Sequence, residues 1–345
     1  MRRWPLALLV GLVATTVAFG AGHAPYSRAD VANPVASADA AWVPLVLSQG
    51  DRLNIAVVAD MRQFAGPGRY DSPRYFRGAV EAIAARGDVD VVISPGDIDP
   101  VEGVYWTLTS TLGSGVVWYP VAGNHELPGN GREAARGANM RWLNAHDYGG
   151  VIPGPTGCVT TTYAVDIENV HLVMLNEYCD EAGDTATHGD VPDHLYEWLA
   201  ADLATTDQEH IIVFGHEPAY PQPDRATGRS RHVGDSLDQH PATRDRFWAL
   251  LREHGVLAYV CGHTHNYSAL FIDGVWQIDV GHARGVADAG APSTYVLLHI
   301  ARDDVSFGAY RSFAGAAYAL AETEGLAGSA ASQKGAPIHA IGRAQ

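Results

Sequence analysis

Five short apolar runs in this chain each lead, through a glycine or alanine, into a polar residue. The runs are rich in Val, Ile and Ala and have the length of buried strands; they cover residues 53–59, 89–93, 116–121, 211–214 and 256–261. The polar residues at their ends are Asp60, Asp97, Asn124, His216, and the pair His263 and His265. Because ligands gather at the carboxyl ends of strands in open α/β sheets, we expect these six side chains to face one pocket.

Helix-like segments alternate with the apolar runs. Their spacing predicts helices at residues 73–86, 105–112, 132–146, 193–204 and 243–254. Two more apolar runs, 159–166 and 170–177, are joined by a three-residue turn and predict a hairpin. Short strand candidates at residues 269–272, 275–280 and 294–301 follow the last helix. This alternation is typical of an α/β domain.

The beginning of the chain has the layout of a secretory signal peptide. Arg2 and Arg3 precede an apolar stretch at residues 6–19, and small residues follow up to Ala24. The apolar stretch is shorter than the ~20 residues that a spanning helix needs. We therefore expect export to the periplasm or the extracellular space and a mature protein without a stable membrane span; an uncleaved anchor is the alternative.

Composition divides the rest of the chain and limits its partners. After the signal peptide at residues 1–24, a linker rich in Ala, Ser and Pro is predicted at 25–50, one domain at 51–312 and an Ala/Gly-rich tail at 313–345. The hydrophobic content of 47% suits a filled core in one large domain. With a formal charge of −16 and Lys334 as the single lysine, the chain has no basic patch that would predict a nucleic-acid partner.

The predicted export permits disulfides among the three cysteines. Cys158 and Cys179 flank the predicted hairpin, and a turn near Glu168 would bring them almost opposite each other. We predict a disulfide between them, with two buried thiols as the alternative. Cys261 ends an apolar strand and is interpreted as a packed core residue.

The polar residues at the strand ends suit a transition-metal centre. Carboxylate, carboxamide and imidazole groups favour Mn, Fe, Zn or Co. A single ion uses three or four of them, whereas six are enough for two ions about 3.5 Å apart, the arrangement that stabilises the attacking and leaving oxygens at phosphorus. Each Gly-Asp or Gly-His pair alone is more often a turn, so the prediction of two ions depends on the five pieces together.

In their order along the chain, these pieces resemble the calcineurin-like metallophosphoesterase superfamily. The matching motifs are Asp60, Gly96-Asp97, Gly123-Asn124-His125-Glu126, Gly215-His216 and Gly262-His263-Thr264-His265, within residues 53–311. The resemblance implies an α/β fold, a four-layer αββα sandwich with the metal site at strand ends. It also implies hydrolysis of a small anionic phosphate mono- or diester by a hydroxide that bridges two ions.

The resemblance assigns a role to each motif residue. Asp60 and His265 would hold the first ion, and Asp97 would bridge both. Asn124, His216 and His263 would hold the second ion. His125 would lie beside the leaving group, as a general acid or an electrostatic stabiliser.

One motif departs from the family pattern. The first motif usually reads Asp-x-His, but here Arg62 follows Asp60 and Met61. In the purple acid phosphatase branch a tyrosine three residues after the bridging Asp replaces that His; here Pro100 stands at that place. Asp99 can supply the missing ligand, or Arg62 can bind a substrate phosphate with its planar fork. Alternatively, Arg62 and Asp99 form an ion pair that stiffens the two loops.

The roles of a polar loop and of one further histidine stay open. Residues 217–241, which include Arg229, Arg231 and His232, form a polar loop that either covers the pocket and accepts an anion or is simply solvated. His282 is another polar residue at a strand end, either a support for the ligands or structural.

A metallo-β-lactamase-like hydrolase fits poorly, because no Asp-His pair follows His265. The other alternative is a non-catalytic or single-metal descendant that acts as an exported binding module.

Overall fold

The computed structural model describes residues 52–127, 133–180, 182–184 and 186–328, all of which belong to the unit Val43–Gln345. The predicted signal peptide (1–24) and linker (25–50) lie outside these residues, and so does the end of the predicted tail. Within the described ranges, no helix has both the length and the apolar character needed to cross a membrane.

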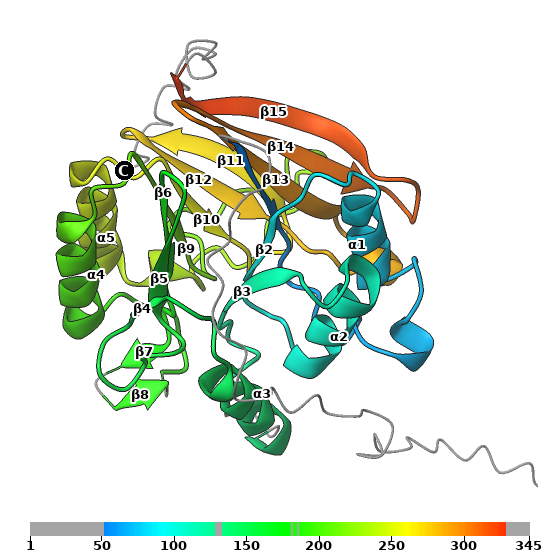
Figure 1. The fold of residues 1–345 in the computed structure, drawn as a ribbon, viewed down its shortest axis with the longest axis horizontal. Helices are drawn as coiled ribbons and strands as arrows, with labels where there is room; N and C mark the ends of the chain where they lie inside the picture. The colour runs from blue at the N-terminus through cyan, green and yellow to red at the C-terminus, as the bar shows by residue number, and fades with distance from the viewer. Residues whose placement is uncertain (1–51, 128–132, 181, 185, 329–345) are drawn as a thin grey trace, which may run out of the picture. The chain divides into compact units, whose positions relative to one another are not determined.

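Two large β-sheets form the centre of this unit (Figure 1). The first has six strands in the order β15-β14-β13-β1-β2-β3, and the second has seven in the order β11-β12-β10-β9-β6-β5-β4. The bounds in the first sheet are β1 Arg52–Val57, β2 Val91–Pro95, β3 Val117–Val121, β13 Ser293–Ala301, β14 Asp304–Ser312 and β15 Ala319–Ala327. Those in the second are β4 Ile152–Pro153, β5 Tyr163–Ile167, β6 Val170–Met174, β9 His210–Phe214, β10 Ala258–Cys261, β11 Tyr267–Ile272 and β12 Val275–Val280.

Helices cover the outer face of each sheet. Those on the first sheet are α1 Phe76–Ala84, α2 Val101–Leu112 and α3 Glu133–Ala145, and those on the second are α4 Asp193–Thr205 and α5 Pro241–Glu253. Short elements complete the description: the β7-β8 ribbon, Cys179–Asp180 with Gly183–Asp184, and the 3-10 helices Gly68–Tyr70, Leu237–Gln239 and Gly285–Ala287.

Three apolar clusters separate these layers. The central cluster joins side chains from both sheets, such as Ile55 on β1 and Ile212 on β9. A second cluster packs α1, α2 and α3 against the first sheet, and a third packs α4 and α5 against the second. The predicted four-layer αββα sandwich is therefore confirmed, because each sheet buries one face against the other sheet and one against helices.

The strands that carry the polar motifs run in parallel within each sheet. In the first sheet β1 pairs with β2, and β2 with β3, in parallel. In the second, β6, β9, β10 and β12 are successive parallel neighbours. All their carboxyl ends within a sheet therefore lie at the same edge, which is what brings residues distant in sequence to one site.

The folded part extends beyond the predicted boundary at residue 312. β14 pairs with β13 in the first sheet. β15 lies within the stretch predicted as a tail and pairs antiparallel with β14. The signal for β14 was present in the sequence, since the buried residues Val305, Phe307 and Ala309 alternate with others along the strand. β15 carries a weaker signal, because six of its nine residues are Ala, Glu or Gly and only Leu326 is buried.

Cys158 and Cys179 are joined by a disulfide, with 6.1 Å between their Cα atoms. The strands of the hairpin between them, β5 and β6, are shorter than predicted, and Cys179 belongs to β7. The bond closes a loop with a sequence separation of 21 residues. Cys261 is buried at the end of β10 and has a free thiol.

A buried charged contact ties the hairpin to helix α4. His171 on β6 donates from Nδ1 to Asp166 on β5 at 2.7 Å and from Nε2 to Asp202 on α4 at 2.8 Å. Both bonds require the protonated ring. Burial alone would lower the pKa of His171, but the two carboxylates outweigh it and raise the pKa above its ordinary value.

We expect this contact to make stability depend on pH. The folded protein binds the His171 proton more tightly than the unfolded chain, so the stabilisation is complete below about pH 6.5 and is lost as the pH rises through the higher folded pKa. The difference in thermal midpoint between wild type and His171→Gln should therefore shrink between pH 6 and pH 9. Asp202→Asn, which removes the main counter-charge, should show the same trend. A difference that grows with pH would contradict this interpretation.

Candidate metal centre

The glycines in the motifs are required because the strand ends approach each other closely. A Cβ on Gly96, whose φ is +79°, would lie 2.6 Å from Cγ of His216. One on Gly123 would lie 2.8 Å from Oδ1 of Asp97, and one on Gly262 would lie 2.9 Å from the Cβ of Ala59. No side chain fits at these three places, so the Gly in each motif allows neighbouring strand ends to bring their polar residues together.

Four of the six predicted ligands have a backbone conformation that non-glycine residues rarely adopt. The φ angles are 55° at Asp60, 54° at Asp97, 69° at His263 and 59° at His265. Such residues each cost on the order of 1–3 kcal/mol and cluster at functional sites. The surrounding structure holds them in place through hydrogen bonds such as that from the N–H of His263 to Oδ2 of Asp60, at 2.8 Å.

Two histidines form the centre of the predicted second metal position. His216 donates from Nδ1 to the carbonyl oxygen of Pro95 at 2.9 Å, and His263 donates from Nε2 to that of Asp235 at 3.0 Å. These bonds assign the tautomers and leave lone pairs on Nε2 of His216 and Nδ1 of His263, which face each other at 3.2 Å. Burial lowers the pKa of both rings, so neither supplies a proton between them. A cation at this place satisfies both lone pairs.

Oxygen ligands adjoin these nitrogens. Oδ1 of Asp97 lies 3.5 Å from Nε2 of His216 and accepts the backbone N–H of His125 at 3.1 Å. Asn124 directly precedes His125 in the chain. Its Oδ1 is buried and has no hydrogen-bond partner. A buried amide oxygen left in this way is costly unless an ion binds it. The residues at the second position therefore fit a metal ion.

Buried glutamates hold the strand ends in register. Oε2 of Glu126 accepts the N–H of Gly123 at 2.7 Å and that of Asp97 at 3.0 Å, which ties β3 to β2. Oε2 of Glu177, after β6, accepts the N–H of His216 at 2.9 Å and that of Glu217 at 2.7 Å, which ties β6 to β9. The cost of burying the Asn-His-Glu motif is thus reduced by backbone donors.

The predicted first position brings Asp60, Asp97 and His265 together. Each offers a ligand atom within 4.8 Å of the other two. Oδ1 of Asp60 is buried without a hydrogen bond and lies 3.4 Å from Nε2 of His265. A guanidinium is also present here, because Arg284 donates from Nη2 to the same Nε2 at 2.9 Å. The ligand atoms of Asp60, Asp97 and His265 suit an ion, but Nε2 of His265 already accepts a hydrogen bond from Arg284.

The carboxyl groups of Asp60 and Asp97 differ in how readily they ionise. Burial and the neighbouring Asp97 raise the pKa of Asp60 well above its ordinary value. Burial opposes ionisation of Asp97 as well, but His216, His125 and Arg62 outweigh it and lower the pKa of that carboxyl. Asp97 is therefore the carboxylate that is ready to bind a cation.

Arg62 and Asp99 do not form the ion pair considered for them. Arg62 contacts Nε2 of His125, and its Nη1 lies 3.8 Å from Oδ2 of Asp97. Asp99 instead accepts a hydrogen bond from Nδ2 of Asn139 on α3 at 3.1 Å. Arg62 thus faces the metal centre beside His125, whereas Asp99 supports the packing of α3.

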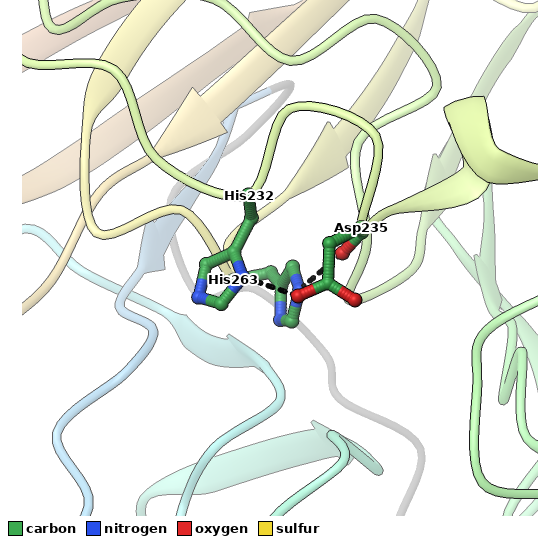
Figure 2. Close-up of side chains that lie close together, drawn as sticks. All are labelled: His232, Asp235 and His263. Atoms are coloured by element: carbon green, nitrogen blue, oxygen red, sulfur yellow. Dashed lines mark hydrogen bonds and ion pairs between the residues drawn. The ribbon is translucent and has the colours of Figure 1, made fainter.

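The polar loop at residues 217–241 reaches the centre, as Figure 2 shows for His232 and Asp235. His232 donates to Oδ2 of Asp235 at 3.0 Å, and its ring centroid lies 4.1 Å from that of His263. From the same loop, Arg231 contacts Nδ1 of His265. The loop therefore covers the centre with both imidazole and guanidinium groups.

Comparison with known proteins identifies the family. The family model for calcineurin-like phosphoesterases matches residues 53–267. The chain belongs to this family. The matched range includes the motif residues from Asp60 to His265.

Curated relatives in this family are phosphatases. The chain is 29% identical over 177 residues to purple acid phosphatase 22 of Arabidopsis thaliana, covering 49% of this chain and 35% of that protein. It is 29% identical over 170 residues to tartrate-resistant acid phosphatase type 5 of Mus musculus, covering 45% of each. The chain thus spans less than half the length of these relatives.

Solved structures share the fold. PhoD aligns with a TM-score of 0.57 at 12% identity, over 83% of this chain and 71% of that one. GAP50, the anchor in the inner membrane complex of Plasmodium, aligns with a TM-score of 0.51 at 12% identity, over 80% of this chain and 89% of that one. At this identity the likeness shows the calcineurin-like phosphoesterase fold alone.

Three residues of the centre were missed by sequence analysis. Glu177 follows β6, whose end carries no Gly-Asp or Gly-His pair. Arg284 lies two residues beyond the Gly-His pair that follows β12, and Asp288 accepts a hydrogen bond from Nδ1 of His265 at 2.9 Å. The sequence signal was the Gly281-His282 pair after β12. His282 itself donates to the carbonyl oxygen of Ala291 at 3.0 Å, so it shapes the loop that carries Arg284.

Proposed function

We propose that this calcineurin-like phosphoesterase hydrolyses a small phosphate ester with the help of an ion held by Asp97, Asn124, His216 and His263. The pair of facing imidazole lone pairs, 3.2 Å apart, is the observation that carries this proposal. Zn, Mn, Fe and Co suit such mixed nitrogen and oxygen ligands. The first position, with Asp60 and His265, belongs to the same proposed site, and the sequence predicts an ion there as well.

The chain's own residues suggest how the reaction is assisted. A bound transition-metal ion supplies Lewis acidity toward a phosphoryl oxygen and makes water a stronger nucleophile. Arg62, with 23% of its side chain exposed beside Asp97, is proposed to bind a phosphoryl oxygen of the substrate. His125, whose side chain is 16% exposed, is proposed to give a proton to the departing alcohol.

The proposed activity is tested by removal and return of the metal. We expect the purified chain to hydrolyse p-nitrophenyl phosphate or bis-p-nitrophenyl phosphate, to lose this activity after chelation, and to regain it with Zn²⁺ or Mn²⁺. Comparing the two substrates decides between a monoesterase and a diesterase. A metal-loaded chain that hydrolyses neither ester would instead support the exported binding module.

The place of action is proposed from the amino terminus alone. Arg2, Arg3 and the apolar stretch at residues 6–19 predict export. We propose that the chain acts outside the cytoplasm on a soluble, anionic phosphoester.

A further inference from the structure

We infer that the guanidinium of Arg284 takes the place of the first metal ion, so that the centre holds one ion per chain. This inference rests on the proposed function, because it concerns the same site. It departs from the two ions that the sequence predicts, and it makes Asp60 and His265 partners of arginine rather than of metal.

The neutral ring of His265 can offer a metal at most one lone pair at Nε2. Arg284 donates from Nη2 to this atom at 2.9 Å, while Nδ1–H of His265 donates to Oδ2 of Asp288 at 2.9 Å. In the other tautomer Nε2 carries the proton and faces Oδ1 of Asp60 at 3.4 Å. With the proton on Nδ1, the lone pair of Nε2 is occupied by Arg284; with the proton on Nε2, that atom has no lone pair to bind a metal.

Arg284 is held in this position on several sides. Its Nε donates to the carbonyl oxygen of Asp60 at 2.6 Å, and its backbone N–H donates to Nδ1 of His282 at 3.2 Å. The next residue along, Gly285, packs so closely that a Cβ there would lie 3.0 Å from the Cα of Tyr75. Arg284 itself is only 8% exposed. Its guanidinium therefore cannot leave without breaking buried hydrogen bonds.

Few ligands then remain for an ion at the first position. The histidine of the first family motif is replaced by Arg62, and Nε2 of His265 is committed to Arg284. Of the three described residues that come together at this position, Asp60 and Asp97 then remain to offer a ligand atom. Protein sites for transition metals use at least three protein ligands, so two carboxylates, one of them shared, make a poor site.

The surrounding charge also opposes a second cation. Arg62 lies 3.8 Å from Asp97, Arg231 contacts His265, and Arg229 donates to Asp288 at 2.8 Å. With Arg284, four guanidinium groups surround the position and match the carboxyl groups of Asp60, Asp97, Asp288 and Asp279 in number. The positive charge that a metal would bring is already supplied by fixed arginines, and an added divalent ion would be repelled by them.

Metal content is the measurement that tests the inference. The purified chain is loaded with excess Zn²⁺ or Mn²⁺, desalted, and analysed for metal per chain. We expect one ion in the wild type, one in His265→Ala, and none in His216→Ala. Arg284→Met, which keeps an apolar stem but removes the donors, should bind a second ion; Arg74→Met, at an exposed arginine, is the matched control and should keep one.

The possible outcomes separate the two proposals. Two ions in the wild type, with one lost in His265→Ala, would overturn the inference and leave the proposed function intact. No bound ion in the loaded, folded wild type would overturn the proposed function itself. If Arg284→Met fails to fold, as judged by circular dichroism, the comparison of wild type with His265→Ala still decides between one ion and two.

Discussion

Replacing His216 with alanine is expected to lower kcat/KM for a phosphoester by at least roughly a hundredfold. The side chain is fully buried, its Nδ1–H is fixed on the Pro95 carbonyl, and its Nε2 lone pair faces His263 at 3.2 Å. Removal of an outer-shell partner of a metal ligand typically costs about 10- to 100-fold in metal affinity, so removal of a ligand should cost at least as much.

The matched control for this experiment is His254→Ala. His254 follows helix α5 and precedes β10, so it lies at the edge of the second sheet opposite the carboxyl ends of the parallel strands. This variant should keep wild-type activity. Activity that survives unchanged in His216→Ala, with the fold intact, would show that the proposed site is wrong.

Replacing Gly96 with alanine should also inactivate the protein, although Gly96 is not itself a ligand. The new Cβ would lie 2.6 Å from Cγ of His216 and 2.9 Å from the Cα of Gly123, so either the histidine or the adjoining strand end must move. Displacement of a reacting group by about 1 Å can cost on the order of 100-fold in rate. We expect a loss of this size in kcat/KM at saturating metal.

Gly87→Ala separates this steric effect from backbone strain. Gly87 has a φ of +69°, close to the +79° of Gly96, but a Cβ there would meet nothing within 4 Å. Both variants should lose roughly 1–2 kcal/mol of stability through the left-handed conformation. Only Gly96→Ala should lose activity, and equal activity in the two variants would refute the role given to the close approach of strand ends.

The strands and helices could be predicted well because apolar periodicity and strand-end motifs both carry strong physical signals, and the four layers were predicted through the family resemblance that the order of the motifs carries. The runs before Asp60, Asp97, Asn124, His216 and His263 are all strands with buried residues, and the order of the motifs indicated the family. Weaker elements were missed. β15, an edge strand of the first sheet in which only Leu326 is buried, has little periodicity to detect, so the domain boundary was placed too early.

The candidate site was predictable only where a ligand belongs to a motif. Asp97, Asn124, His216 and His263 adjoin glycines that the close approach of strands requires. Arg284 has no such mark, and its importance depends on a contact with His265 that joins the ends of β12 and β10. The tautomers of the histidines, which decide the available lone pairs, depend on backbone carbonyls that no sequence pattern identifies.

A crystal of the Zn²⁺-loaded chain, measured at the zinc absorption edge, tests the central claim most directly. The account predicts an anomalous peak at bonding distance, about 2.0–2.3 Å, from Nε2 of His216, Nδ1 of His263 and oxygens of Asp97 and Asn124. A zinc peak at another place, with Nε2 of His216 and Nδ1 of His263 still facing each other without an ion, would contradict it.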